Sequence, residues 1–325
     1  MNFKSLYNEQ KEIVDKLLTD SLSNRKPSSL YEPASFILSN PGKRLRPVLV
    51  LFSAKAAGGS FDKAYNAALS VEMLHNFTLV HDDIMDNADK RRGRPTLHVK
   101  YDLSTAILAG DVLLAVAYEY LRRDLNGTAA AVVESFTKGL VEVCEGQSLD
   151  KEFEVRRTVS LSEYMMMIQK KTAALSKMCC EMGGLLAGGN DATVTALSNY
   201  GNDLGLAFQI QDDILDILAD EETLGKPVGG DLIEGKKTFL FLKALEKSSG
   251  KVREKLEAVI DNKGINPNQV EEFKNIYFDL GVIDFAEKEV ETLTQSAVNS
   301  LNTLKESTEK EFLKQLAFAM LKRNN

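Results

Sequence analysis

The chain has 325 residues, 44% of them hydrophobic and 27% charged, which is ordinary for a soluble globular protein. Its net charge of −7 argues against nucleic acid as the main partner. An odd count of three cysteines suits a reducing compartment, and the first residues lack the apolar core of a signal peptide. No stretch reaches about 18 uncharged apolar residues, as a membrane-spanning helix requires. We therefore expect a cytoplasmic protein with no membrane span.

Helix-period patterns dominate the chain, and the period-2 alternation typical of strands is almost absent. Several of these segments are apolar over more than one face, which indicates central rather than surface helices. Only short Gly or Asn turns separate them, and no linker or internal repeat appears. We predict an all-α fold in which residues 1–325 form one domain, with many helices around a central group. In chain order the predicted long helices are Ala64 to Asp86, Ser104 to Arg123, Ala129 to Gly146, Ser162 to Leu186 and Ala192 to Leu218.

The first of these helices ends in the sequence LVHDDIMD. Asp82 and Asp86 are four residues apart, so they share one helical face, and Asp83 lies beside them. Like charges at this spacing destabilise a helix by a few tenths of a kcal/mol, and burial increases that cost greatly. A carboxylate cluster of this kind needs a counter-charge.

The same spacing recurs in FQIQDDILDIL, where Asp212, Asp213 and Asp216 stand in an otherwise apolar helix. A solvated acidic face or a helix cap would explain one such cluster about as well as a binding site does. Two copies on apolar helices favour the binding site. Carboxylate oxygens suit Mg²⁺, which keeps few protein ligands and takes phosphate oxygens as others. We predict that the two clusters hold a diphosphate through metal ions.

Basic residues lie close to both clusters in the sequence. Arg91 and Arg92 follow the first cluster, and the loop Pro41 to Pro47 carries Lys43, Arg44 and Arg46. Arginine binds phosphate oxygens through two parallel hydrogen bonds, and lysine adds a point charge. Further positive charge comes from Lys170-Lys171, Lys226 and Lys236-Lys237. For Arg44 and Lys237 we favour ordinary surface charges, whereas Arg91 and Arg92 are expected to share an anionic ligand with the metals.

Residues 42–238 carry an ordered set of motifs: GKRLRP (42–47), E-x-x-H (72–75), HDDIMD-x(4)-RRG (81–93), GQSLD (146–150), KT (171–172), FQIQDDILD (208–216) and GKPVGGDLIEGKKT (225–238). Single motifs of this kind are weak, but the ordered set is highly specific. The set resembles that of the trans-isoprenyl diphosphate synthases, also called polyprenyl synthases, of the short-chain type that makes geranylgeranyl or farnesyl diphosphate.

The resemblance implies a single bundle of mainly antiparallel helices around a central active-site cavity, usually as a homodimer. It also implies about three Mg²⁺ ions that bridge an allylic diphosphate. Asp82, Asp86 and Asp212 would be direct ligands. The other three aspartates, Asp83, Asp213 and Asp216, would assist directly or through metal-bound water.

The resemblance also assigns the remaining polar residues. The allylic diphosphate would be aided by Arg91, Lys171, Lys226 and, more distantly, Lys236. The second substrate, isopentenyl diphosphate, would be bound by Lys43, Arg46, His75 and Arg92. The groups that face the reacting carbons would be Gln209, the Thr172 hydroxyl and the Lys171 carbonyl, with Gln147 and Asp150 in supporting roles.

The expected reaction is ionisation of a C5, C10 or C15 allylic diphosphate, attack by the alkene of isopentenyl diphosphate and loss of a proton, with release of pyrophosphate. Phe77 lies five residues before Asp82 on the same helix and is expected to form the floor of the product cavity, with the small Thr78 beside it. In the family that the sequence resembles, an aromatic residue followed by a small one at this place is typical of short-chain enzymes, which implies a C20 product, with C15 a close second and C30 or longer disfavoured.

Two other functions use similar sequences. A class I terpene cyclase ionises the same substrates but normally has only one aspartate-rich motif of this type. A non-catalytic partner subunit of a synthase tends to lose aspartates or the basic residues of KRLRP, and here all are present. Both alternatives are testable with allylic diphosphates in the presence and absence of isopentenyl diphosphate.

Overall fold

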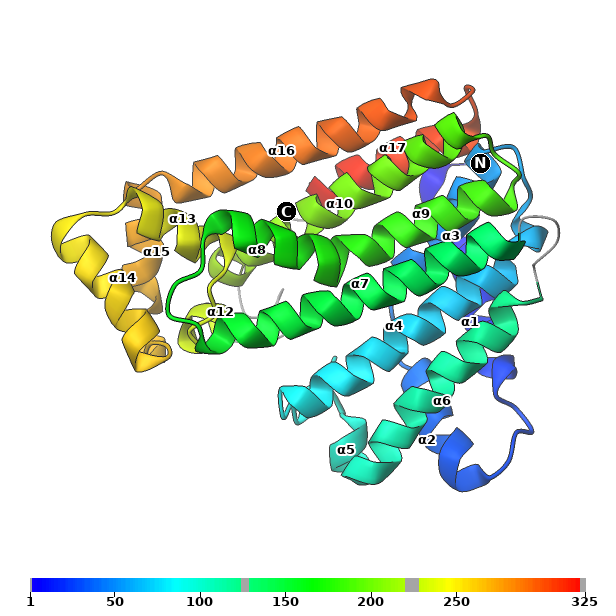
Figure 1. Ribbon diagram of the computed structural model, residues 1–325, viewed down its shortest axis with the longest axis horizontal. Coiled ribbons are helices and arrows are strands. Elements are labelled where there is room, and N and C mark those ends of the chain that lie inside the picture. Colours follow the sequence, from blue (N-terminus) through cyan, green and yellow to red (C-terminus); the bar gives the residue numbers. More distant parts are fainter. Residues whose placement is uncertain (1, 124–128, 220–227, 322–325) are drawn as a thin grey trace. The chain divides into compact units, whose positions relative to one another are not determined.

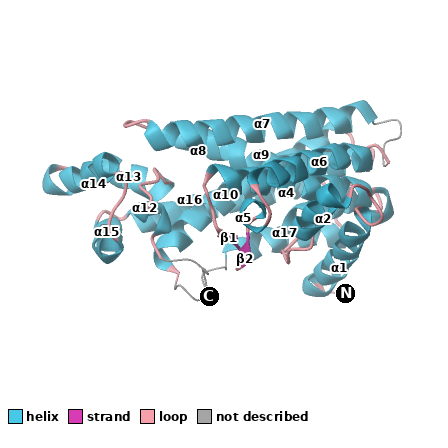
Figure 2. Cartoon of the chain, turned by 90° about the horizontal axis from the view of Figure 1, so that it is seen from below, coloured by secondary structure: helices cyan, strands magenta, loops and turns pink. Residues whose placement is uncertain are grey.

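The computed structural model describes residues 2–123, 129–219 and 228–321. Strand structure in this part of the chain is confined to one short pair, β1 (Lys90–Arg91) and β2 (Arg94–Pro95), so the predicted all-α class is confirmed (Figure 2). The α-helices are α1 (Phe3–Ser21), α2 (Ser28–Leu38), α3 (Leu45–Ala56), α4 (Tyr65–Met85), α5 (Leu97–Lys100), α6 (Leu103–Leu121), α7 (Ala129–Val155), α8 (Leu161–Ile168), α9 (Ala174–Leu186), α10 (Asp191–Leu218), α12 (Gly230–Ile233), α13 (Phe239–Lys247), α14 (Gly250–Asn262), α15 (Val270–Asp279), α16 (Val282–Ser300) and α17 (Thr308–Leu321). Single turns are η1 (Phe61–Lys63), the π-helix η2 (Gln169–Ala173), η3 (Pro267–Gln269) and η4 (Leu301–Thr303).

Several helices begin where a polar side chain satisfies a free backbone N–H group. The Asp102 carboxylate accepts the Thr105 N–H at 2.8 Å and starts α6. Ser160 and Glu163 form a reciprocal capping box at the start of α8. These caps explain why α8 begins directly after a loop without glycine.

The chain divides into two compact units, and the first comprises residues 1–137, 178–197 and 303–313. Helix α3 is its most buried element, because every residue from Pro47 to Ser53 is shielded from solvent. Helices α4 and α6 lie side by side, and α4 also contacts α3 (Figure 1). The first aspartate cluster stands at the end of α4, and the basic loop leads into α3, so this unit supports both.

The second unit comprises residues 138–177, 198–302 and 314–325. Its core joins α10 residues such as Ile210 and Ile214 to α13 residues such as Phe239 and Phe241. Helix α13 contacts α8, α14, α15 and α16. The second aspartate cluster lies on α10 against this core. The prediction that residues 1–325 form a single domain stays a prediction.

The predicted helix boundaries differ from the structure in two places. Helix α7 continues past Gly146 to Val155, and the helix expected over residues 162–186 is interrupted by η2. By length and composition alone α6 resembles a membrane-spanning helix, although the core helices of soluble proteins pass the same test. It carries Asp111 and Glu119, so it is not an uncharged apolar stretch.

Candidate active site

The first aspartate cluster ends α4, and its three carboxylates have different surroundings. Asp83 is buried, Asp82 is half-buried, and Asp86 is exposed at the helix C-cap. The Asp83 Oδ1 accepts a hydrogen bond from Arg91 Nε at 2.7 Å, and no donor in the described residues reaches Oδ2. Burial raises the pKa of Asp83, and the Arg91 guanidinium opposes that rise. Arg91 is therefore the counter-charge that the cluster required.

The segment that carries Arg91 returns to the cluster through a two-residue hairpin. Strands β1 and β2 pair with Arg91 opposite Arg94, and the turn residues Arg92 and Gly93 have φ values of 52° and 75°. Both values lie in the left-handed region that such tight hairpins require. The turn sends the two arginines to different partners, since Arg92 Nη1 donates to the Pro41 carbonyl at 3.0 Å. A side chain at Gly42 would lie 2.9 Å from Arg92 Nη1, so glycine permits this approach.

The basic loop is held by Arg44, which occupies a left-handed conformation just before α3. Its guanidinium is buried and forms ion pairs with Asp15 at 2.6 Å and Glu72 at 2.7 Å. It also donates to the carbonyls of Leu38 and Asn40, both at 3.0 Å. The expectation of a surface charge at Arg44 is wrong, because the loop needs an internal anchor. Of the basic residues in this loop, Lys43 and Arg46 remain the predicted substrate-binding residues.

Arg46 and His75 form the second attachment between the loop and α4. Arg46 Nη1 lies 3.1 Å from His75 Nε2. Burial, and then the positive charge of Arg46 and Arg92, lower the pKa of His75 well below its ordinary value. A neutral His75 accepts from Arg46, which can only donate. Since Glu72 and His75 are three residues apart on α4, one helical face binds the loop through both arginines.

The predicted chain-length residues lie between this face and the aspartates. Phe77 is half-buried, and its ring lies 4.6 Å from the His81 ring. The Thr78 hydroxyl donates to the His75 carbonyl at 2.8 Å. His81 Nδ1 lies 3.1 Å from the Phe77 carbonyl, the helix-end hydrogen bond that the sequence favoured over a catalytic role. The assignment of Phe77 as a cavity floor stays a prediction.

In the second cluster, on α10, two of the three carboxylates are buried. Asp213 Oδ2 accepts from the Tyr164 hydroxyl at 2.5 Å and from the Phe239 N–H at 3.0 Å, and Oδ1 accepts from Gln209 Nε2 at 3.2 Å. Burial nevertheless raises the pKa of Asp213 to about 7. Asp212, on the same helix, is half-buried.

The third carboxylate of this cluster organises the chain after the helix. Asp216 Oδ2 accepts the backbone N–H of Asp231 at 3.1 Å, and the Gly229 N–H donates to the Asp216 carbonyl at 2.7 Å. Gly229 has a φ of 72°, and a side chain there would lie 2.6 Å from the Val270 side chain. Asp216 therefore fixes the start of α12. The predicted diphosphate residue Lys226 lies outside the described residues.

Lys171 and Thr172 belong to the π-helix η2, and π-turns of this kind are frequent at functional sites. A side chain at Gly146 on α7 would lie 2.2 Å from the Lys171 N atom, and one at Gly205 on α10 would lie 2.5 Å from the Ala173 Cα. Both glycines permit close contact with the turn. Lys171 Nζ forms an ion pair with Asp150, one helical turn after Gly146. The spacing of the GQSLD motif follows from these two contacts.

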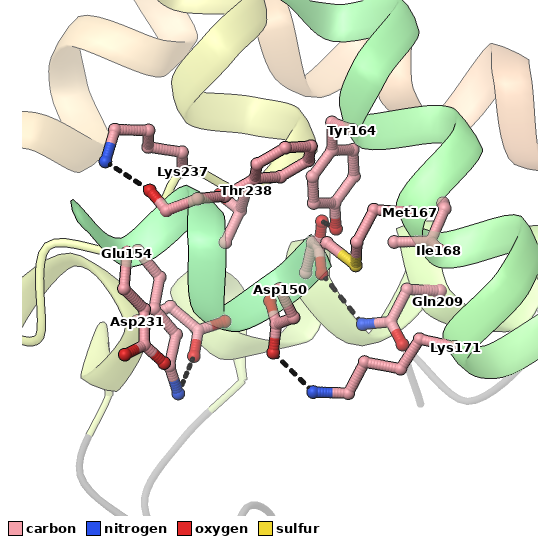
Figure 3. Close-up of a pocket in the computed structure, with 13 residues that line it drawn as sticks. Asp150, Glu154, Tyr164, Met167, Ile168, Lys171, Gln209, Asp231, Lys237 and Thr238 are labelled. Atoms are coloured by element: carbon pink, nitrogen blue, oxygen red, sulfur yellow. Dashed lines mark hydrogen bonds and ion pairs between the residues drawn. The ribbon is translucent and has the colours of Figure 1, made fainter. Parts of the chain in front are cut away.

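A cavity of about 160 Å³ opens beside these residues (Figure 3). Among its lining residues are the predicted Lys171, Gln209, Asp213 and Lys236, together with Asp150. Lys236 Nζ lies 2.7 Å from Glu234 and 3.6 Å from Asp231. In Figure 3 the Lys171 ammonium points to Asp150. Gln209 Nε2 donates to Asp213 of the second cluster.

Residues 27–277 match the family model described as polyprenyl synthetase. The chain is 39% identical to the short chain isoprenyl diphosphate synthase of Methanothermobacter thermautotrophicus, with all of both chains covered, and 40% identical to the geranylgeranyl diphosphate synthase of Sulfolobus acidocaldarius, with 92% of each covered. The crystal structure of geranylgeranyl pyrophosphate synthetase from Pyrococcus horikoshii superposes with a TM-score of 0.93 at 36% identity over 98% of both chains.

The chain belongs to the polyprenyl synthetase family. It is a prenyltransferase, as the sequence resemblance predicted, and the cyclase and the non-catalytic subunit are not favoured.

The carboxylates predicted to bind metal are compatible with Mg²⁺. No three His, Cys, Asp or Glu side chains within residues 2–123, 129–219 and 228–321 converge closely enough to hold a metal ion alone. Mg²⁺ does not need such a cage, because it takes oxygens from one or two carboxylates and from substrate phosphates. The hard, partly exposed oxygens of Asp82, Asp86 and Asp212 fit that ion. Their roles as ligands stay a prediction.

Several site residues of the polyprenyl synthetase were missed in the sequence. Tyr164 lies in the apolar run LSEYMMMI and resembles a core residue, although a buried tyrosine hydroxyl usually has a partner. Glu72 belongs to the E-x-x-H motif, and the sequence assigned it no role. In the structure it pairs with Arg44. Lys237, expected on the surface, is half-buried and donates to the Phe153 carbonyl at 2.8 Å.

Proposed function

We propose that this polyprenyl synthetase condenses isopentenyl diphosphate with C5, C10 and C15 allylic diphosphates and releases pyrophosphate, with C20 geranylgeranyl diphosphate as the product. The observation that carries the proposal is the presence of cationic side chains beside each aspartate cluster. Arg91 contacts the first cluster, and Lys171 and Lys236 line the cavity beside the second. The names of several relatives at 37–44% identity support the C20 product.

The two substrates are proposed to use different groups. Mg²⁺ bound by Asp82, Asp86 and Asp212, about three ions in all, supplies neutralisation of the charge that develops on the leaving allylic diphosphate. Arg91, Lys171, Lys226 and Lys236 bind the same diphosphate. The isopentenyl diphosphate is bound by the loop residues Lys43 and Arg46 together with His75 and Arg92.

Stabilisation of the leaving diphosphate is expected to make the largest contribution to the rate enhancement. The negative charge on this group develops in the transition state, so the cations bind the transition state more strongly than the bound substrate. The Thr172 hydroxyl, the Lys171 carbonyl and Gln209 face the allylic cation and exclude water from it. No His or Glu in the proposed set is free to remove the final proton, since the neutral His75 is bonded to Arg46. The departing diphosphate is therefore the proposed proton acceptor.

The test is incubation of the protein with labelled isopentenyl diphosphate and dimethylallyl, geranyl or farnesyl diphosphate, with products resolved by chain length. We expect C20 product from all three primers and none without Mg²⁺. Activity after chelation of Mg²⁺ would refute the metal assignment. A cyclic hydrocarbon formed from farnesyl or geranylgeranyl diphosphate alone would refute the condensation.

The homodimer is part of the same proposal. Helix α6 exposes Leu103, Ile107 and Leu108, which are 53%, 38% and 57% accessible. Adjacent exposed apolar residues of this size mark interaction surfaces in soluble proteins. We expect Leu108→Glu to convert a dimer into a monomer in sedimentation equilibrium, with helicity retained. A wild-type monomer at micromolar concentration would refute the dimer.

A further inference from the structure

The two oxygens of Asp213 are both engaged by protein groups. Oδ2 accepts from the Tyr164 hydroxyl at 2.5 Å and from the Phe239 N–H at 3.0 Å, while Oδ1 accepts from Gln209 Nε2 at 3.2 Å. The residue is only 4% exposed. A backbone N–H and an amide NH₂ group can only donate, so Asp213 accepts from Phe239 and Gln209 whatever its own protonation state. Asp213 is therefore better equipped to orient its neighbours than to bind a metal ion.

This arrangement sets the direction of the next hydrogen bond. Because the Gln209 NH₂ group is turned to Asp213, its Oε1 faces Thr172. An amide oxygen can only accept, so the Thr172 hydroxyl must donate, and the two atoms lie 2.8 Å apart. With its proton committed to Gln209, the hydroxyl presents only lone pairs elsewhere. Lone pairs stabilise a cation, whereas an O–H dipole pointed at a cation would repel it.

We propose that Tyr164, Asp213, Gln209 and Thr172 form a hydrogen-bond relay that fixes the polarity of the Thr172 hydroxyl toward the allylic cation. Tyr164 and Asp213 are positioning residues in this relay. The inference rests on the proposed condensation, in which Thr172 faces the reacting carbons. It reassigns Asp213, which the sequence placed among the metal-binding aspartates.

The relay is held at both ends by the local structure. Tyr164 is 4% exposed and follows Glu163, whose capping box with Ser160 fixes the first turn of α8. At the other end, Thr172 belongs to the π-helix, and Gly205 allows α10 to approach that turn. Gln209 stands one turn after Gly205 on α10. The same close packing that brings the turn to α10 therefore brings Thr172 within reach of Gln209.

The first experiment removes the hydroxyl that begins the relay. Tyr164→Phe keeps the ring and is expected to lower kcat about tenfold, the effect of one misdirected hydrogen bond, with KM for isopentenyl diphosphate unchanged. Tyr277→Phe is the matched control. Tyr277 is fully buried in the same unit, and its hydroxyl has no hydrogen-bond partner in the described part of the chain. A similar loss of kcat in both variants would overturn the relay.

A double-mutant cycle connects Tyr164 to the far end of the relay. In a Thr172→Val background the hydroxyl is absent, so adding Tyr164→Phe should reduce kcat by less than about twofold. Full additivity, with the same tenfold loss in both backgrounds, would contradict transmission through Thr172. Thermal unfolding of each variant shows whether a loss of activity results from loss of the folded state.

Asp213→Asn distinguishes positioning from metal binding without measuring turnover. Mg²⁺ with inorganic pyrophosphate should raise the Tm of wild type and of Asp213→Asn equally, whereas Asp212→Asn should abolish that rise. Loss of the rise in Asp213→Asn would overturn the reassignment. If the wild-type protein makes no condensation product, the proposed function is refuted. If it does make the product, the results for the variants decide whether the relay exists.

Discussion

The two aspartate clusters have identical spacing but different environments. The inner aspartate of the first cluster, Asp83, depends on one cation, Arg91, and one of its oxygens has no donor among the described residues. Its counterpart Asp213 is held by three neutral donors from α8, α10 and the start of α13. The first cluster ends a helix, with Asp86 exposed, whereas the second lies within α10 against the core. The same motif therefore ends a helix beside one cation in the first cluster and is enclosed by neutral donors in the second.

Substitution of the first aspartate of each cluster, Asp82 or Asp212, tests whether this difference in environment extends to catalysis. Asp82→Ala and Asp212→Ala should each reduce kcat by about a thousandfold or more, because each removes a carboxylate expected to bind metal. The measurement is condensation of labelled isopentenyl diphosphate across a Mg²⁺ titration. If one variant kept near wild-type activity, the clusters would differ in function as well as in environment.

Substitution of the partners of Asp83 and Asp213 tests how much each contact contributes to the free energy of unfolding. Arg91→Ala leaves Asp83 buried without its cation and should lower the free energy of unfolding by about 2 kcal/mol, since hydrogen bonds to charged groups have about that value. Tyr164→Phe should cost about 1 kcal/mol, because two donors to Asp213 remain. Urea unfolding of both variants measures the comparison. A larger loss in Tyr164→Phe would show that the second cluster also depends on one dominant partner.

Helix α4, which carries the first cluster, is also expected to limit the chain length of the product. No such role is expected of α10, which carries the second cluster. Phe77→Ala removes a half-buried ring one turn before the aspartates and should lengthen the product by one or more C5 units. Overall condensation should change little, because no charged group is altered. Chromatography of the products against chain-length standards gives the answer. A product of unchanged length would exclude Phe77 as the floor.

The smallest effect concerns the cap of the helix that carries Tyr164. The Ser160 N–H, the Arg156 guanidinium and the Ser160 hydroxyl lower the pKa of Glu163 to about 2, below its ordinary value of 4.5. A depressed pKa gives stability that is present above pH 4.5 and is lost as the pH falls toward 2. Wild type should therefore exceed Glu163→Gln in stability at pH 7, and the gap should close near pH 2. A gap independent of pH would contradict this origin.

Much of the fold and site followed from local sequence. The helical periods predicted α4, α6 and α10 almost to their ends, since apolar spacing is a property of neighbouring residues. The RRG segment and the repeated DD-x-x-D were recognisable for the same reason. The break at η2 was not predicted, because it depends on close contact with Gly146 and Gly205, which are distant in sequence.

The sequence by itself determined the all-α class, the family and the chemistry available to it, since these depend on residue types and spacings. Only the tertiary structure decided which charged side chains are buried and paired within the protein. It buried Arg44 between Asp15 and Glu72, and it enclosed Asp213 among Tyr164, Phe239 and Gln209. The physical reason is that burial and hydrogen-bond direction are set by neighbours far along the chain. Six aspartates that are alike in sequence therefore differ in burial and in hydrogen-bond partners.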